Sequence, residues 1–325
     1  MGADGRNFAR CASVGTVESE QHVTVDEPVL LAEVVDEHIL VLTLNRPERR
    51  NAVNVELADR LGAEIERFDR DPGLWVCVLT GAGTEAFCAG MDMQEFTGRV
   101  ADGQRTRLGL LETSNHPVVP TWKPLIAAIN GSAVAGGWKI ASRCDLRIAA
   151  ETARIGVTEN RWNLAAPFIA DPGVFATGAI AAEVALMARP ITADRAYQVG
   201  LVNAVVPAEE LLEEALRWAR HLCTLGQEAV RGHKKLLYYG RFAPPGELGE
   251  LASDIFYWMG AGKPGVVVDS TVGPRAFKEK RQPDFTQMFH PARLSCRVCG
   301  TVYVVARSGE RNGPACCGQA LEEQS

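Results

Sequence analysis

Two short stretches of the sequence have residue types that could bring backbone close to a ligand. FCAGMDMQEF (87–96) and INGSAVAGGWKIASRCD (129–145) each place glycine or another small residue just before a predicted helix. A small residue lets a ligand approach the backbone, and the first N–H groups of a helix have no partner inside it. Two such N–H groups aimed at one point form an oxyanion hole, which would stabilise an enolate or tetrahedral oxyanion derived from a thioester carbonyl.

A third stretch, IGVTENRWNL (155–164), adds an acid/base group. Glu159 follows a predicted strand and is a lone carboxylate in a weakly charged stretch. A positioned carboxylate can take up a proton and return it. The sequence therefore predicts a site that stabilises an oxyanion and moves a proton beside it.

The cysteines predict a separate metal site. Four of the nine crowd the end of the chain: Cys296, Cys299, Cys316 and Cys317. A CxxC turn presents two thiolates to one metal, whereas an adjacent cysteine pair is unusual for a zinc ribbon. The other five are scattered, as expected of buried thiols kept reduced in the cytoplasm.

Hydrophobic patterns predict an α/β fold with a mainly parallel core sheet. A strand pair around the turn at 36–38 is followed by alternating strands and helices with short connections. The expected strands lie within 29–45, 74–81, 124–131 and 144–150, and the expected helices lie at about 54–69, 136–143, 174–188, 192–199 and 208–224.

Composition limits the class of protein. The 325 residues are 46% hydrophobic and 23% charged, which is ordinary for a globular domain, and the formal charge is −6. An acidic chain argues against a nucleic-acid binder, and no apolar run approaches the ~20 residues that span a bilayer. Residues 1–27 are predicted to be a mobile leader, and 286–295 a linker to a metal module at 296–325.

The chain from 28 to 285 resembles the enoyl-CoA hydratase/isomerase (crotonase) family. The resemblance rests on six stretches in order: LNRPERRNAV (44–53), FCAGMD (87–92), AVAGG followed by CDLRIAA, GVTE (156–159), RPITADRAYQVGLVNAVVP (189–207) and FKEKRQPDF (277–285). It implies a spiral of ββα turns with a helical trimerisation region at about 226–285. It also implies homotrimers or hexamers, and a CoA or carrier-bound pantetheine thioester as substrate.

The resemblance also implies roles for particular residues. The oxyanion hole would be formed by the N–H groups of Met91 and Gly136. The CoA moiety would lie, mostly through backbone contacts, along Arg50, Ala52, Ala89 and Asp92.

At one position the sequence departs from the family's hydratases. Those carry two glutamates, one of them three residues after the oxyanion-hole glycine, where this chain has Lys139; the other is retained as Glu159. Lys139 could pair with Glu159 and lower its pKa, bind a substrate carboxylate, donate a proton, or turn its ammonium to solvent. The neighbouring Trp138 is expected to pack in the core.

A second departure follows Glu159. The family's glycine-rich turn is replaced by NRWNLAAPFIADPG (160–173). Trp162 and Asn163 could line the acyl pocket, although Trp162 could equally be core. Asp171 could enter the site as a further acid/base group, but ADPG is also an ordinary turn.

These features leave the reaction open. A single glutamate beside an oxyanion hole favours a hydratase or lyase of an enoyl or hydroxyacyl thioester. The alternatives are an isomerase, a decarboxylase, a thioester hydrolase, or a thioester-binding protein without turnover whose metal module serves assembly.

The last thirty residues resemble desulforedoxin, a rubredoxin-type protein with the same CxxC…CC order. That resemblance implies a tetrahedral four-cysteine site for iron, and zinc suits the same four sulfurs. A module this small cannot bury enough core alone, so the metal would hold it folded.

Overall fold

A computed structural model of the chain describes residues 28–101, 121–170, 178–241, 246–250, 252, 253 and 269–285, and short strands between 291 and 323. The predicted leader at 1–27 lies outside the described residues. So do Asp171 and three of the four clustered cysteines, Cys296, Cys299 and Cys317.

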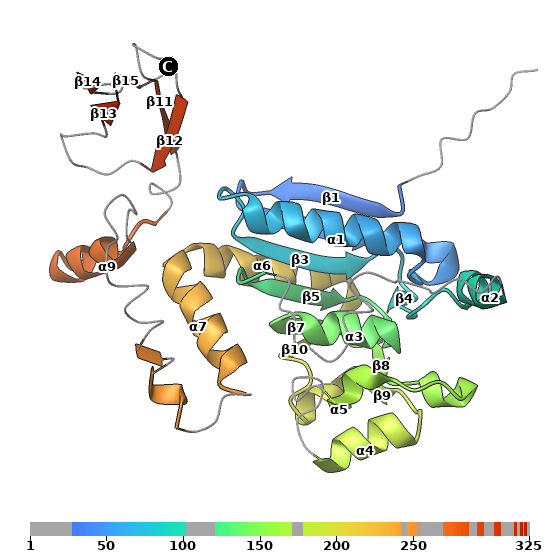
Figure 1. Cartoon of the computed structure of the whole chain (residues 1–325). Helices are drawn as coiled ribbons and strands as arrows, with labels where there is room; N and C mark the ends of the chain where they lie inside the picture. The colour runs from blue at the N-terminus through green and yellow to red at the C-terminus, as the bar shows by residue number, and fades with distance from the viewer. Residues whose placement is uncertain are drawn as a thin grey trace, which may run out of the picture.

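The main sheet has six strands in the order β1-β2-β3-β5-β7-β10 (Figure 1). They are β1 (Leu30–Val35), β2 (Ile39–Leu44), β3 (Val76–Gly81), β5 (Leu125–Ile129), β7 (Leu146–Ala150) and β10 (Ala204–Val206). β1 and β2 are antiparallel, and the remaining neighbours are parallel. The predicted mainly parallel sheet is confirmed.

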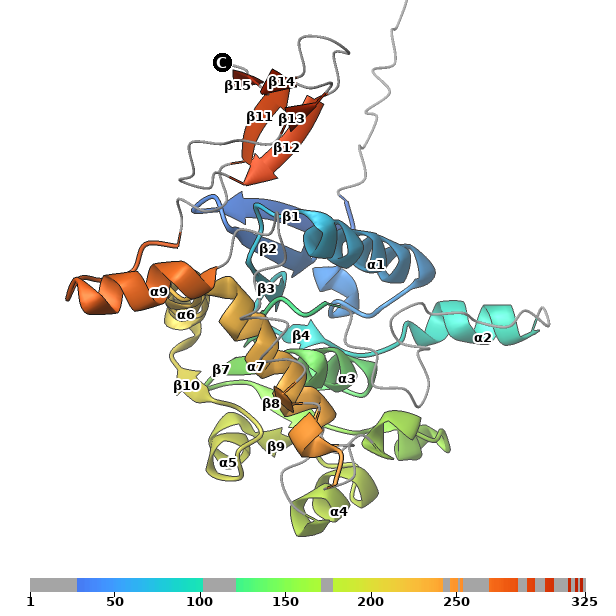
Figure 2. The ribbon, with the colours of Figure 1, turned by 60° about the vertical axis from the view of Figure 1, so that its left-hand side comes forward.

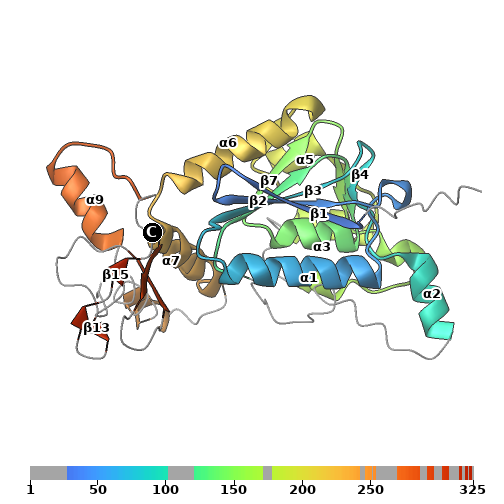
Figure 3. The same cartoon turned by 90° about the horizontal axis from the view of Figure 1, so that it is seen from above.

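Helices cover both faces of this sheet (Figure 3). Because strand side chains alternate between faces, Leu40 and Leu42 pack with α1 (Val55–Arg70) and α3 (Gly136–Arg143). Ile39 and Val41 instead pack with α6 (Leu211–Cys223). The core therefore lies in two layers, one on each side of the sheet.

A second, four-stranded sheet carries the candidate site. Its order is β4 (Ala86–Cys88), β6 (Ser132–Val134), β8 (Arg154–Gly156) and β9 (Ile191–Thr192). The first three strands run parallel, and β9 is antiparallel to β8. Strands of two or three residues are too short to show periodicity, so the hydrophobic pattern alone did not predict this sheet.

The remaining helices follow the predicted order. They are α2 (Met93–Ala101), α4 (Gly178–Leu186), α5 (Ala193–Gln198), α7 (Gln227–Tyr239) and α9 (Asp269–Lys278), with 3-10 turns η1 (Pro47–Arg49), η3 (Glu159–Trp162), η4 (Pro167–Ala170) and η5 (Ala208–Glu210). Within the described residues, none of the helices combines the length and apolarity needed to cross a membrane.

The end of the chain forms its own small sheets (Figure 2). β11 (Pro291–Ser295) lies between β12 (Val302–Ala306) and β15 (Glu322–Glu323), and β13 (Ala315–Cys316) pairs with β14 (Gln319–Ala320). The last five residues of the predicted linker therefore belong to a strand. β11 pairs with β12 so that Ser295 lies opposite Val302. In the sequence, the CxxC stretch lies between these two residues.

Candidate active site

The three chemically interesting segments follow the same edge of the second sheet. β4, β6 and β8 are parallel neighbours, and Met91, Gly136 and Glu159 each come two or three residues after the carboxyl end of one of them. The carboxyl ends of adjacent parallel strands meet at one edge, where α/β proteins bind ligands. The topology thus brings together the residues that sequence analysis selected separately.

A close backbone approach joins the first two segments. Gly90 has a φ of +96°, and a Cβ on it would lie 3.0 Å from the nitrogen of Gly136 and 2.9 Å from the Cβ of Ala135. Only glycine fits such a contact and such a φ without strain. Gly90 therefore lets the chain before Met91 lie against the start of α3.

The N–H groups of Met91 and Gly136 are both available to a ligand. Met91 forms a parallel bridge with Val53 in which Gly90 O and Asp92 N make the hydrogen bonds, so the N–H of Met91 points away from Val53. Gly136 is the first residue of α3, where a helical N–H has no acceptor in its own helix. Among the described residues neither N–H donates a hydrogen bond.

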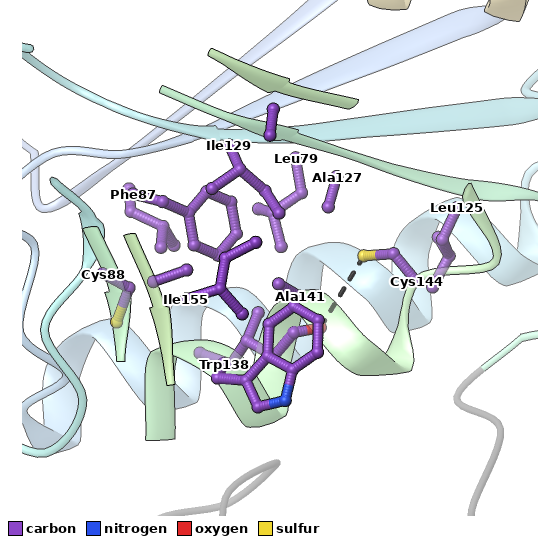
Figure 4. Packing of buried hydrophobic residues seen from close by; sticks show 14 of the residues in the cluster. Leu79, Phe87, Cys88, Leu125, Ala127, Ile129, Trp138, Ala141, Cys144 and Ile155 are labelled. Atoms are coloured by element: carbon purple, nitrogen blue, oxygen red, sulfur yellow. Dashed lines mark hydrogen bonds between the residues drawn. The ribbon is translucent and has the colours of Figure 1, made fainter. Parts of the chain in front are cut away.

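Strain and tight packing hold the start of α3. Ala135 has φ 54° and ψ −129°, a conformation that L residues other than glycine rarely adopt. Behind it, a Cβ on Gly137 would lie 2.0 Å from the carbonyl oxygen of Cys88. Trp138 packs in the core beside Phe87 and Ile155 (Figure 4), as predicted.

Glu159 is a half-buried carboxyl group at the start of η3. Burial raises its pKa above the ordinary value of 4.5, against hydrogen bonds from backbone N–H groups that favour the ionised form. One of these bonds runs from Thr158 N to Oε2, at 2.9 Å. A carboxyl group with a raised pKa is suited to accept a proton and give it back.

Lys139 lies one helical turn after Gly136 and is only 8% exposed, so most of its side chain is buried. No ion pair joins Lys139 to Glu159 among the described residues, and Lys139 is not among the causes of the Glu159 shift. Of the alternatives for Lys139, an ion pair that lowers the pKa of Glu159 does not fit the structure, because burial raises that pKa.

The residues expected along CoA surround the same segment. Arg50 is exposed and pairs with Glu85 at 3.2 Å, and its carbonyl accepts from Ala89 N. Ala52 and Asp92 are buried. The structure thus joins Arg50 to Ala89 directly, and Ala52 to Asp92 through Arg46. Their contact with CoA stays a prediction.

The residues after Glu159 are exposed. Trp162 is 70% exposed, so it is not a core residue, and Asn163 follows it in the left-handed conformation. Asn160 ties this turn to α4 by donating to the carbonyls of Ala185 and Leu186. Whether Asp171 enters the site is a question outside the described residues.

The predicted metal site can be compared with the structure only through the backbone. Cys316 lies in β13 and pairs with Gln319, while Cys296, Cys299 and Cys317 are outside the described residues. Among the residues that the structure does describe, no group of three or more possible ligands gathers elsewhere. The donor set itself, four thiols, fits tetrahedral iron or zinc.

Comparison with known proteins agrees with this geometry. The family model described as enoyl-CoA hydratase/isomerase matches residues 35–288. The chain belongs to the enoyl-CoA hydratase/isomerase family. Most of the chain, including every described residue of the candidate site, lies within the match.

Individual relatives of this family member are similar over nearly their whole length. An enoyl-CoA hydratase of Mycobacterium tuberculosis is 34% identical over 260 residues, which are 76% of this chain and 93% of that protein. A mevalonyl-coenzyme A hydratase of Aspergillus fumigatus is 34% identical over 277 residues, 83% and 98% of the two chains. The crystal structure of an enoyl-CoA hydratase from Mycobacterium marinum superimposes with a TM-score of 0.71 at 33% identity, covering 80% of this chain and 99% of that one.

Sequence reasoning missed one pair of residues near the site. Arg46 and Asp92 form a largely buried ion pair at 2.9 Å beside Met91. Arg46 stands in the family-like LNRPERRNAV stretch and could have been noticed there. Its partner is 46 positions away, so only the fold reveals the pair.

Proposed function

We propose that this member of the family adds water to the double bond of an enoyl thioester, with Glu159 as its single acid/base group. The observation that carries the proposal is the placement, at the same sheet edge, of one carboxyl group with a raised pKa and two N–H groups that donate to no described residue. The hydratase names of the relatives support it.

In this reaction Glu159 removes a proton from water as the water oxygen bonds to the β-carbon of the enoyl group. The π electrons move onto the thioester carbonyl oxygen and form an enolate. The N–H groups of Met91 and Gly136 stabilise that negative charge. Glu159 then gives the proton to the α-carbon, so the carboxylate is regenerated and one water has been added.

Lys139 replaces the second glutamate of family hydratases, so one carboxylate must serve both proton transfers. We assign Lys139 to the machinery because it is buried one turn from Gly136. A buried ammonium can orient the attacking water or contact a polar substrate group. The variant below tests its contribution.

The further features of the proposal rest on the family and the cysteine pattern. The active form would be a homotrimer or hexamer in the cytoplasm, with CoA or a carrier pantetheine on the substrate. Trp162 and Asn163 would face the acyl group. Cys296, Cys299, Cys316 and Cys317 would hold iron or zinc, whose role would be to fold the terminal module.

The test is turnover of a panel of enoyl-, hydroxyacyl-, aryl-propenoyl- and malonyl-type CoA thioesters, followed by mass spectrometry. We expect a gain of one water on an enoyl thioester and a loss of at least about 100-fold in Glu159→Gln, the typical effect of removing an acid/base group. Lys139→Ala should also reduce kcat. The variant Arg60→Lys, in an exposed pair on α1, is the control.

A different mass change would identify an isomerase, decarboxylase or hydrolase instead. Tight binding of thioesters without any turnover would show a binding protein, and Glu159→Gln would then keep the affinity of the wild type.

A further inference from the structure

The segment that carries Met91 is held in place from one side. Val53 N donates to Gly90 O at 2.7 Å, and Asp92 N donates to Val53 O at 2.9 Å. These two bonds fix the peptide planes before and after Met91, and with them the direction of its N–H. An oxyanion-hole donor acts only when it points at the developing charge, so this direction matters for the rate.

Arg46 joins the two segments that form these bonds, the one with Val53 and the one with Met91. Its Nη1 donates to the carbonyl of Ala52 at 2.5 Å, and its Nη2 donates to Asp92 Oδ2 at 2.9 Å. The side chains of Arg46 and Asp92 are 13% and 10% exposed. A planar guanidinium can make two such bonds in fixed directions, which an ammonium cannot do.

Asp92 carries the connection onward to α2. Its Oδ1 accepts from the backbone N–H groups of Gln94 and Glu95, at the start of that helix. Burial is the largest single effect and opposes the charge on Asp92, but the hydrogen bonds from Arg46, Glu95 and Gln94 and the charge of Arg46 together outweigh it and lower the pKa of the carboxyl below 3.8. Asp92 is therefore ionised at neutral pH and joins Arg46 to the helix after Met91.

The backbone of Arg46 is held by hydrogen bonds to Asn51, at the other end of the same turn. Its N–H donates to Asn51 Oδ1 at 3.0 Å, and its carbonyl accepts from Asn51 N at 2.8 Å. Asn51 is completely buried and donates from Nδ2 to the carbonyls of Ala82 and Ala86. The turn is thus bonded to both ends of the connection leading into β4.

We propose that Arg46 and Asp92 are positioning residues that aim the N–H of Met91 at the thioester oxygen. This inference rests on the proposed function, because it assigns that N–H to the oxyanion hole. Neither side chain needs to touch the substrate. Arg46 holds the Ala52–Val53 peptide, whose N–H bonds Gly90 O before Met91, and Asp92 itself follows Met91. Their substitution should weaken polarisation of the carbonyl while leaving most of the thioester's binding contacts in place.

The test compares Asp92→Asn, Arg46→Lys and the double variant with wild type. Asp92→Asn keeps an oxygen that can accept from the first N–H groups of α2 but loses the negative charge. Arg46→Lys keeps the positive charge but loses the planar guanidinium that makes two bonds. Arg49→Lys is the matched control, since Arg49 bonds Gln94 of the same helix from the exposed side. We measure kcat and KM on crotonyl-CoA, the urea midpoint, and the infrared carbonyl band of bound butyryl-CoA labelled with ¹³C at the thioester carbon.

We expect each single variant to lose about 10- to 100-fold in kcat, with KM within about threefold. This loss is smaller than the loss of up to about 1000-fold that follows removal of a whole oxyanion-hole donor. The carbonyl band should move back toward its frequency in water. The double variant should lose less than the product of the two single losses, since the pair acts as a unit. Arg49→Lys should keep kcat within about twofold.

Folded variants with unchanged kcat and an unchanged carbonyl band would overturn the inference while leaving the proposed function intact. A fall in kcat that only follows the urea midpoint, with the band unmoved, would also overturn it and show a purely structural pair. If wild type adds water to no enoyl thioester of the panel and does not shift the butyryl-CoA band, the proposed function itself fails.

Discussion

Glu159 combines burial with hydrogen bonds from the backbone, and these act on its charge in opposite directions. Burial is the larger effect, so the pKa rises. No partner cation within the described residues cancels the cost of its charge, because Lys139 forms no ion pair with it. At the scale of single residues, the candidate site therefore contains one carboxyl group, that of Glu159, whose raised pKa favours changes of its protonation state.

The raised pKa predicts the acid limb of the pH–rate profile. Hydration needs the ionised carboxylate in the free enzyme, and a raised pKa means that protonation begins at a higher pH than for an ordinary glutamate. kcat/KM should therefore fall on the acid side with a midpoint above 4.5. Initial rates of crotonyl-CoA hydration, from the most acidic pH at which the protein stays folded up to neutral pH, measure this midpoint. A midpoint at or below 4.5 would contradict this assignment of the base.

The strained backbone of Ala135 leads us to expect that replacing it by glycine stabilises the protein. Its φ of 54° with ψ −129° costs a non-glycine residue about 1–3 kcal/mol, and glycine removes that strain at an entropic cost of about 0.5–1 kcal/mol. Ala135→Gly should raise the free energy of unfolding by about 1 kcal/mol in urea titrations. Ala133→Gly in the adjacent strand β6 is the control and should lower it.

At the scale of helices and strands, the contact between β4 and α3 determines how close the N–H groups of Met91 and Gly136 lie. Gly90 and Gly137 both lie where a Cβ would strike backbone, so the strand and the helix approach more closely than other residues would allow. Short parallel strands then place the start of η3 at the same edge. The packing of backbone against backbone, more than any side chain, brings the segments of Met91 and Gly136 together.

Gly137→Ala should break this contact. The new Cβ would lie 2.0 Å from Cys88 O, which is backbone and cannot turn aside, so β4 and α3 must separate. We expect a loss of about 3 kcal/mol or more in unfolding free energy, the upper range of overpacking, together with loss of turnover. Gly62→Ala is the matched control: nothing lies within 4 Å of its added Cβ in α1, and it should stabilise by about 0.5–1 kcal/mol. Equal stability of the two variants would refute the argument.

For the whole molecule, the chemistry and the terminal cysteines occupy separate parts of the chain. Among the described residues, those of the candidate site all lie between 46 and 163, and the strands from β11 onward pair with one another. A metal in the terminal module would thus contribute to folding of that module rather than to proton transfer.

Removal of the metal tests this separation. Elemental analysis of the purified chain should find iron or zinc bound, and Cys316→Ser should release it, because four thiolates are needed for a closed tetrahedral site. Turnover of crotonyl-CoA should stay within about twofold. Loss of turnover on release of the metal, with the oligomeric state unchanged, would place the module in the reaction.

Much of the main sheet and the identity of the site could be predicted from the sequence. The strands β1, β2, β3, β5 and β7 and the helices α1, α3 and α6 are long enough for their hydrophobic period to be recognised, and glycines before predicted helices marked the two N–H segments. The four strands of the second sheet have only two or three residues, so their pattern carries no period, and their pairing is between segments far apart in the chain.

The sequence by itself determined the α/β class, the lone carboxylate Glu159 and the grouped cysteines, because residue type and local spacing are enough to specify them. The resemblance to the family pointed to the candidate donors at Met91 and Gly136. Only the tertiary structure decided that Trp162 is exposed, that Lys139 is buried without pairing to Glu159, and that Arg46 reaches Asp92. Burial and charge pairing depend on residues distant in sequence. Those contacts set the pKa of Glu159 and the direction of the Met91 N–H, and they arise only when the chain folds.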